Sequence, residues 1–133
     1  MASFTGSPLA MLLVSVALGS VGQILLKIGM RVVTSHKPVE VGAAAVVAAI
    51  KAIPNPWVFT GFLCYGVSSI LWLMILKKVP LSTAYPMISM GYVVVVVLSA
   101  LILREPVRWV SAVPGLVLIV AGVSLIGMGL GGK

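Results

Sequence analysis

Lys27 is the residue best placed to do chemistry, because its ammonium group stands at the edge of a long apolar run. An ionisable side chain in such a position is costly unless it finds a partner or a wet cavity. Ser20 and Gln23 precede it at the spacing that puts all three side chains on one helical face. One interpretation is that Lys27 only extends its charge to the membrane interface. The other is an anion site, with phosphate as the anion because lysine is a common phosphate ligand.

A second polar stripe lies in the apolar stretch between 79 and 107. Tyr85, Ser89 and Tyr92 follow one another at spacings that place three hydroxyl groups on one helical face. These hydroxyls serve either hydrogen bonding between helices or the wall of a groove for a polar headgroup. Pro86 removes one backbone hydrogen bond, so we expect a kink at Pro86 and Gly91 beside the stripe.

Glu105 is the carboxylate nearest to the end of this stretch, and it stands between Arg104 and Arg108. One interpretation is a local ion pair at the membrane interface. The other is a pair with a cation on the first helix, such as Lys27 or Arg31, which would latch two helices together. Glu105, Arg104 and Arg31 are therefore the candidates for an ion pair that gates the bundle.

The sequence holds no arrangement of residues that is typical of an enzyme. It has no aspartate, and its single histidine, His36, lies in a polar connection where a surface role is expected. An enzyme would need an acid–base pair or a nucleophile with a positioned base. We therefore expect no catalytic residue, no metal site and no cofactor. Cys64 is alone in an apolar run, so a disulfide within the chain is impossible.

The composition defines the elements that must position these residues. Hydrophobic residues make up 61% of the 133 residues and charged residues 8%, which is more apolar surface than a soluble domain of this size could cover. The net charge of +7 would suggest nucleic acid in a soluble protein. Here the cations lie at the ends of apolar runs, where membrane anchoring explains them better. We therefore expect an integral membrane protein with no nucleic-acid partner.

The apolar runs predict four spanning helices, since a span needs about 20 apolar residues. The start of the chain lacks the basic residues of a signal peptide, so we interpret it as the first span. The prediction is an all-α, four-helix membrane bundle that forms a single domain over residues 1–133. The expected spans are about 8–30, 56–76, 80–103 and 110–128.

The connection between the first two spans predicts a short helix over about 38–53. Val39, Val46, Ile50 and Ile53 fall on one helical face, but the segment is too short to span. We expect it to lie along the membrane interface, with a buried connecting helix as the alternative.

The cations also predict an orientation, since positive residues favour the cytoplasmic side. Six cations fall on the side where the first span ends, and three on the other side. This count favours both termini outside the cytoplasm. The six are Lys27, Arg31, Lys37, Lys51, Arg104 and Arg108, and the three are Lys77, Lys78 and Lys133.

Gly115 and Gly122 lie seven residues apart in the last span. Small residues on one helical face let two helices approach closely in lipid. They serve either packing within the chain or self-association, and we expect a dimer with these two glycines at the interface.

Three segments of the chain resemble the four-helix proteins of the drug/metabolite transporter superfamily, which includes small multidrug resistance-like and EamA-like proteins. They are VGQILLKIG at 21–29, the stretch at 70–107 that contains TAYPMIS and REPV, and GLVLIVAGVSLIG at 115–127. The resemblance is closest to the small subunits of the flippase for aminoarabinose linked to undecaprenyl phosphate. It covers about residues 15–30 and 56–127.

The small multidrug resistance proteins are similar to this chain in the last span, where Gly115 and Gly122 match their dimerisation pattern. Where those exporters hold a membrane glutamate that exchanges protons for cationic drug, this chain aligns Gly19. Where they hold a tryptophan near the site, it aligns Ile88. The resemblance therefore favours an anionic lipid over a cationic drug as substrate.

The expected function is a flippase component that moves a polyprenyl phosphate, bare or linked to a sugar such as aminoarabinose, across the bacterial inner membrane. Lys27 would attract the phosphate, and four polar side chains would replace its lost water. An exporter of a cationic compound or metabolite and a non-transporting subunit of a glycosyltransferase system are the alternatives. The expected partners are membrane lipids and a second copy or a sister four-helix subunit. The four side chains are Ser20, Gln23, Tyr85 and Ser89.

Overall fold

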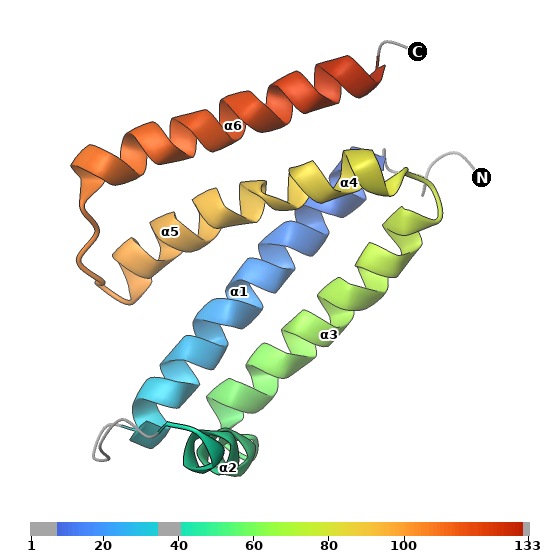
Figure 1. Cartoon of the computed structure of the whole chain (residues 1–133). Helices are drawn as coiled ribbons and strands as arrows, with labels where there is room; N and C mark the ends of the chain where they lie inside the picture. The colour runs from blue at the N-terminus through green and yellow to red at the C-terminus, as the bar shows by residue number, and fades with distance from the viewer. Residues whose placement is uncertain (1–7, 35–40, 132–133) are drawn as a thin grey trace.

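The computed structural model describes residues 8–34 and 41–131, and every regular element in these ranges is a helix (Figure 1). The predicted all-α fold is therefore confirmed. His36, Lys37, Lys133 and positions 38–40 of the predicted interfacial segment lie outside the described residues. The helices are α1 (Pro8–Thr34), α2 (Ala43–Ala52), α3 (Pro56–Leu76), α4 (Leu81–Ile88), α5 (Met90–Ile102) and α6 (Trp109–Gly131).

Four stretches of the described chain are long and apolar enough to cross a membrane: α1, α3, α4 with α5, and α6. α3 has the limits expected from the sequence, whereas α1 continues beyond 30 to Thr34. The third span is divided into α4 and α5 at Ser89. The chain is therefore a multi-pass membrane protein.

α1 and α3 form an antiparallel pair whose backbones come into direct contact (Figure 1). A Cβ atom added at Gly22 would lie 2.9 Å from the carbonyl oxygen of Gly61, and one added at Gly61 would lie 2.9 Å from that of Gly22. At Gly29 the added atom would collide with a methyl group of Val58. These glycines let the two helices approach as closely as small residues allow in lipid.

Asn55 and Pro56 determine where α3 begins. Asn55 is the N-cap residue, and its side chain accepts a hydrogen bond of 3.0 Å from the N–H of Trp57. Pro56 occupies the first helical position, where the missing N–H has no partner to lose. The cap and the proline fix the turn that leads from α2 into α3.

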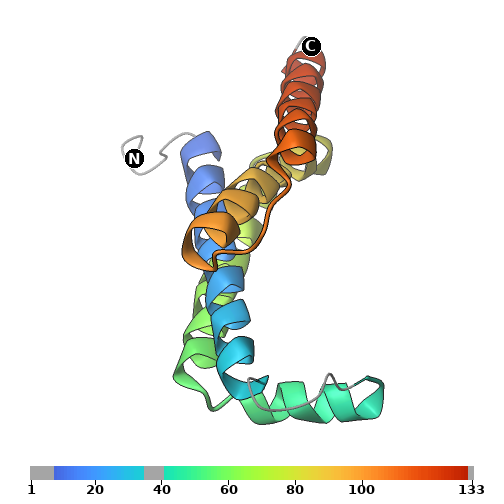
Figure 2. The ribbon, with the colours of Figure 1, turned by 90° about the vertical axis from the view of Figure 1, so that its left-hand side faces the viewer.

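The third span crosses over α1, and α6 lies on its far side, in contact with α4 and α5 (Figures 1 and 2). α2 projects sideways from the end where α1 finishes and α3 begins (Figure 2). Val46 and Ile50 of α2 are exposed, and Ala52 is the buried residue of that helix. Within the described chain this helix is largely uncovered, and both its interfacial position and the buried alternative stay predictions.

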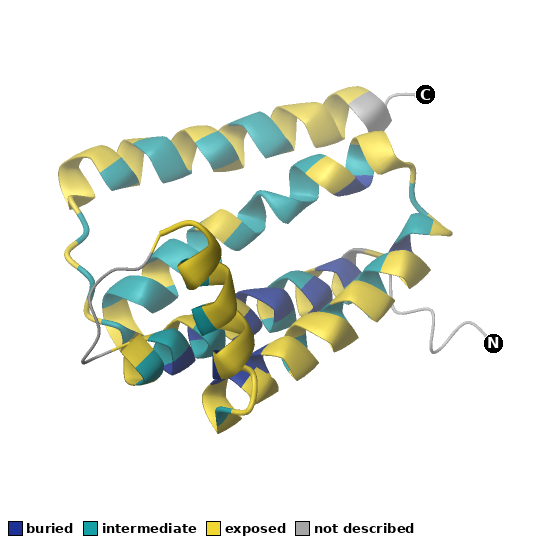
Figure 3. Cartoon of the chain, turned by 60° about the horizontal axis from the view of Figure 1, so that its bottom comes forward, coloured by how far each residue is buried: buried dark blue, intermediate teal, exposed yellow. Residues whose placement is uncertain are grey.

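The buried residues gather where α1 and α3 meet, and the outer faces of the helices are exposed and apolar (Figure 3). Leu12 and Ile75 are almost fully enclosed, whereas Leu118 and Leu125 of α6 are exposed. Lipid tails are as apolar as leucine, so a spanning helix has no need to bury such faces. The exposed apolar surface is that of a protein solvated by lipid.

Candidate functional site

A cavity of about 550 Å³ lies between α1, α3 and the divided third span. Small-molecule sites typically enclose roughly 300–1,000 Å³, so the cavity is large enough for a ligand. Its walls combine serine and tyrosine hydroxyls with aromatic rings and valines. No charged residue is among the described residues that line it. The cavity is therefore polar but electrically neutral.

Three of the predicted substrate-binding residues line this cavity: Ser20 and Gln23 from α1, and Tyr85 from α4. Lys27 and Ser89 are not among the lining residues. Lys27 follows Gln23 by one helical turn, about 6 Å along the axis of α1. The structure thus brings the polar stripes of the first and third spans together and leaves the lysine just beyond them.

The hydroxyl protons of both predicted serines are already used. Ser20 Oγ donates to the carbonyl oxygen of Val16 at 2.8 Å, and Ser89 Oγ donates to that of Pro86 at 2.5 Å. A serine hydroxyl has one proton and two acceptor lone pairs. The two side chains therefore offer acceptors, whereas a phosphate needs donors.

Helix α3 contributes cavity residues that the sequence reasoning did not single out. Ser15 Oγ donates to the carbonyl oxygen of Ser68 at 3.0 Å, and Ser68 Oγ donates to that of Ser15 at 2.7 Å. Ser69, Tyr65 and Trp72 extend the same wall. The four α3 residues lie at i, i+3, i+4 and i+7, which places them on one face of the second span. The same spacing had identified the hydroxyl stripe on the third span, so this pattern could have found them.

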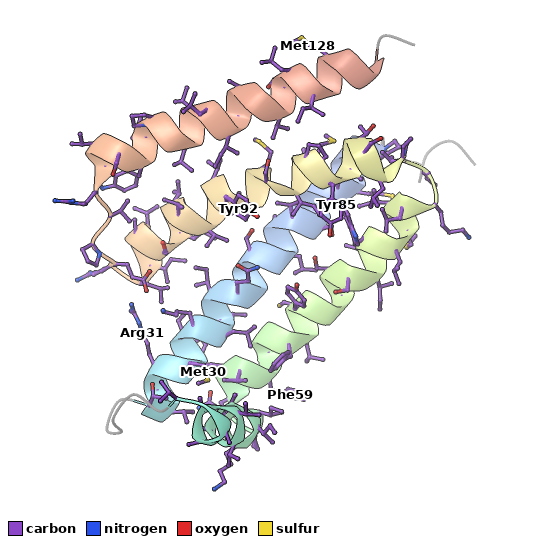
Figure 4. All side chains as sticks on the ribbon, in the orientation of Figure 1. Met30, Arg31, Phe59, Tyr85, Tyr92 and Met128 are labelled. Atoms are coloured by element: carbon purple, nitrogen blue, oxygen red, sulfur yellow. The ribbon has the colours of Figure 1, made fainter. Side chains whose placement is uncertain are left out.

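An edge-to-face aromatic contact joins α3 and α4 at the wall of the cavity. The ring centroids of Trp72 and Tyr85 are 6.2 Å apart with an angle of 69° between the planes. Such pairs stabilise by about 0.5–1.5 kcal/mol beyond their buried area. Tyr85 on α4 and Tyr92 on α5 both line the cavity, one on either side of the division (Figure 4).

The third span divides at Ser89, three residues after Pro86. The N–H of Ser89 donates to the carbonyl oxygen of Pro86, and the N–H of Tyr92 donates to that of Ser89, which tightens the backbone into short i to i+3 turns. Pro86 lies in α4 and Gly91 in the first turn of α5, on either side of the division, and the kink at these two residues stays a prediction. A Cβ atom added at Gly91 would lie 3.3 Å from Val16, so this glycine makes room for α1.

Beyond the cavity, Glu105 joins the end of α1 to the connection between α5 and α6. Arg31 Nη2 lies 2.7 Å from Glu105 Oε1, and Lys27 Nζ lies 3.7 Å from the same oxygen. Arg31 Nη1 also donates to the carbonyl oxygen of Leu103 at 3.0 Å. Figure 4 shows Arg31 at this end of α1. We call Lys27, Arg31 and Glu105 the ion-pair cluster.

Glu105 pairs with cations of α1, which was one of its two expected roles, and not with the arginines next to it in sequence. The described chain has no ion pair between Glu105 and Arg104 or Arg108. Arg104 instead ends α5 with a φ of 51°, the left-handed conformation that commonly terminates helices. This turn carries the chain back toward α1, so that Glu105 meets the cations of the first span.

Gly115 and Gly122 have no neighbour within 4 Å of an added Cβ atom. Packing within the described chain therefore makes no use of their missing side chains, and the face of α6 that carries them is open.

A bundle of spanning helices around a polar cavity has the construction of a small membrane transporter. A protein-family model, described as the EamA-like transporter family, matches residues 2–128. The chain belongs to this family.

Curated relatives are named as subunits of one kind of flippase. A probable 4-amino-4-deoxy-L-arabinose-phosphoundecaprenol flippase subunit ArnF from Proteus mirabilis is 34% identical over 114 residues, which cover 84% of this chain and 85% of that protein. The subunit ArnE from Pseudomonas fluorescens is 32% identical over 76 residues, which cover 55% of this chain and 63% of that protein. The subunit ArnF from Erwinia tasmaniensis is 40% identical over 76 residues, with 56% and 59% covered.

The chain thus spans less than two thirds of several of the curated relatives that it matches. No solved structure matches it.

Proposed function

We propose that this chain is a component of a flippase of the bacterial inner membrane that moves a polyprenyl phosphate lipid. Two independent facts support the proposal: relatives over most of the chain are named as subunits of a phosphoundecaprenol flippase, and the chain has a polar cavity between its spans. The lipid tail would stay in the bilayer while the polar head passes along the cavity. This arrangement spares the head the cost of crossing hydrocarbon without partners.

The observation that carries the proposal is the position of the ion-pair cluster, one helical turn beyond the neutral cavity. Two cations share one carboxylate, so the cluster keeps a net positive charge. Lys27 is only loosely held, since its nitrogen lies 3.7 Å from Glu105 and its side chain is 56% exposed. An anionic head can therefore bind Lys27 without breaking a tight ion pair. Gln23, the cavity residue one helical turn before Lys27, would donate a further hydrogen bond.

The division of the third span provides a place for the movement that transport requires. Pro86 and the short turns at Ser89 lie between the two cavity tyrosines, so bending there would change the distance between their hydroxyls. Rocking of the third span against α1 and α3 would then expose the cavity to one side of the membrane at a time.

A partner subunit completes the proposal. The open face of α6 with Gly115 and Gly122 offers a surface where a second helix could approach closely. The names of the relatives as subunits support a sister four-helix chain or a second copy as the occupant.

The exporter alternative lacks its chemical requirement. Gly19, which the resemblance aligns with the proton-exchanging glutamate, lines the cavity, and a Cβ atom there would lie 3.0 Å from Ser68 Oγ. No acidic residue is among the described residues that line the cavity.

The experiment is a flipping assay with a fluorescently labelled polyprenyl phosphate in proteoliposomes that contain the purified protein and its co-purifying subunits. Loss of a hydrogen bond to a charged group costs about 1.5–3 kcal/mol, so Lys27→Ala should slow flipping by about 10- to 100-fold. Lys78→Ala, which removes an exposed cation after α3, is the matched control and should leave the rate unchanged. Equal rates for the two variants would refute the anion site, and no flipping by the wild type would refute the function.

A further inference from the structure

The connection between α5 and α6 carries two arginines that the described chain leaves without a counter-ion. Among the described residues, the side chains of Arg104 and Arg108 take part in no ion pair and no hydrogen bond. Glu105, which stands between them in sequence, is paired with Arg31 at 2.7 Å. The other carboxylate of the chain, Glu40, lies outside the described residues. The anion for these two guanidinium groups must therefore be sought beyond the described chain.

The turn that carries Arg104 is held in a defined place by α1. Arg31 Nη1 donates to the carbonyl oxygen of Leu103 at 3.0 Å, and Arg31 Nη2 lies 2.7 Å from Glu105 Oε1. These two contacts lie on either side of Arg104, which ends α5 with a φ of 51°. A site whose backbone is already ordered loses less conformational entropy when a ligand binds.

This connection lies where two spans leave the hydrocarbon. The third span ends at Ile102 and the last span begins at Trp109, so the residues between them belong to the edge of the bilayer (Figure 1). Trp109 is 47% exposed, and tryptophan is enriched at membrane interfaces. A guanidinium group binds phosphate through paired N–H donors. The phosphates that are abundant at this depth are those of phospholipid headgroups.

An exposed apolar stripe continues from the arginines along α6. Val110, Val113 and Val117 follow at i, i+3 and i+7 and are 93%, 49% and 60% exposed. A free anion gains nothing from such a stripe, whereas a phospholipid can place its headgroup on the arginines and an acyl chain along the valines. Gly115 is two residues from both Val113 and Val117, which is about 200° around the helix. The stripe and the proposed partner face therefore lie on different sides of α6.

We infer that Arg104, Arg108 and the three exposed valines of α6 form a binding site for an anionic phospholipid of the surrounding bilayer. We call these five residues the phospholipid site. None of them lines the cavity or belongs to the ion-pair cluster. The inference goes beyond the proposed function and does not depend on it, because the lipid bound here is a resident of the membrane and is not transported.

The test is competition against fluorescent phosphatidylglycerol bound to the purified protein in micelles of a non-ionic detergent. Unlabelled phosphatidylglycerol should displace the probe, and zwitterionic phosphatidylcholine should displace it more weakly. Inorganic phosphate at the same concentration should not compete, because it has no acyl chain. The double variant Arg104→Gln with Arg108→Gln should bind phosphatidylglycerol about 30-fold more weakly, since each basic residue beside an anionic lipid surface contributes about fivefold.

A charge-matched control separates the phospholipid site from general attraction. Lys77→Gln with Lys78→Gln removes the same charge from the other end of the third span, which is about 30 Å long. Because exposed charges are screened over roughly 10 Å, this variant should bind phosphatidylglycerol as the wild type does. Arg108→Gln alone should weaken binding about fivefold and keeps the test open if the double arginine variant does not fold. Circular dichroism and size-exclusion profiles establish which variants are folded.

Three results would overturn the inference. Equal losses in the arginine and lysine variants would show a diffuse attraction, and effective competition by inorganic phosphate would show a site for free anions. If Lys27→Ala abolished binding while the arginine variants kept it, the lipid would lie at the ion-pair cluster instead. Failure of the flipping assay alone would remove the proposed function and leave the phospholipid site standing.

Discussion

The contact between the backbones of α1 and α3 makes Gly61→Ala the sharpest test of the fold. The added methyl carbon would lie 2.9 Å from the carbonyl oxygen of Gly22 and 2.9 Å from the nitrogen of Leu26. Ordinary contacts of a Cβ atom begin at 3.4 Å, so the helices would have to separate by about half an ångström. Overpacking of this kind costs about 1–3 kcal/mol, and the affected atoms belong to rigid backbone that has no other rotamer to adopt.

Gly66→Ala is the matched control on the same helix. An added Cβ atom at Gly66 has no neighbour within 4 Å. Both substitutions gain the same helix propensity, about 0.5–1 kcal/mol, so this term cancels when the two variants are compared. Gly61→Ala should therefore be less stable than Gly66→Ala by about 1–3 kcal/mol.

The assay for this comparison is reversible unfolding in mixed micelles, with denaturing detergent as the variable and circular dichroism as the signal. Gly22→Ala should behave like Gly61→Ala, because its added carbon would also lie 2.9 Å from a backbone oxygen of the partner helix. If Gly61→Ala and Gly66→Ala unfold at the same detergent fraction, α1 and α3 do not pack through their backbones, and the wall of the cavity is misplaced.

Two further predictions concern the end of the bundle beyond the cavity. In double-mutant cycles of unfolding free energy, Glu105→Gln should couple to Arg31→Gln by about 0.5–1 kcal/mol and more weakly to Lys27→Gln, because the two nitrogens lie 2.7 and 3.7 Å from Glu105 Oε1. High salt should diminish both coupling energies. Stronger coupling to Lys27 than to Arg31 would contradict the ion-pair cluster as described. Arg104→Gly should raise the unfolding free energy by about 1 kcal/mol, because the φ of 51° suits glycine. Arg104→Ala should not raise it. Equal stabilities of the two variants would contradict a strained end of α5.

The sequence was sufficient to predict the spans, because hydrocarbon imposes a length and an apolar composition that a single chain must show by itself. The limits of α3 could be read from Pro56, which suits a first helical turn, and from the lysines after Leu76. A kink near Pro86 could be expected because proline removes one backbone hydrogen bond, but the division itself falls at Ser89, and α6 continues undivided through Pro114. These are local properties of the chain.

The composition of the cavity could be predicted only in part, because it depends on which faces of different helices meet. Ser20, Gln23 and Tyr85 were visible as stripes on their own helices, whereas Ser68 on α3 looked like an ordinary polar residue in a span. Its importance comes from the reciprocal hydrogen bonds with Ser15, across 53 residues of sequence. No local pattern contains that information.

The direction of hydrogen bonding was also beyond the sequence, and it changes the function assigned to the serines. A serine in a spanning helix can donate to the carbonyl oxygen one turn earlier or to a ligand, but its single proton cannot do both. Ser20 and Ser89 were predicted as groups that would replace the water around a phosphate. Both donate to backbone carbonyl oxygens of their own helix, so the remaining donors near the cavity are Lys27, Gln23 and the tyrosine and tryptophan side chains of its wall.

The neutral cavity owes its space to glycines on facing helices. Gly19 on α1 lies where an added Cβ atom would be 3.0 Å from Ser68 Oγ, and Gly91 on α5 lies where one would be 3.7 Å from Ser20 Oγ. A Cβ atom at Gly19 would be tight against Ser68, whereas one at Gly91 would be tight against Val16 at 3.3 Å and in ordinary contact with Ser20. Glycine at 19 therefore keeps space open at the wall of the cavity, at the position that the resemblance aligns with the glutamate of a cation exporter.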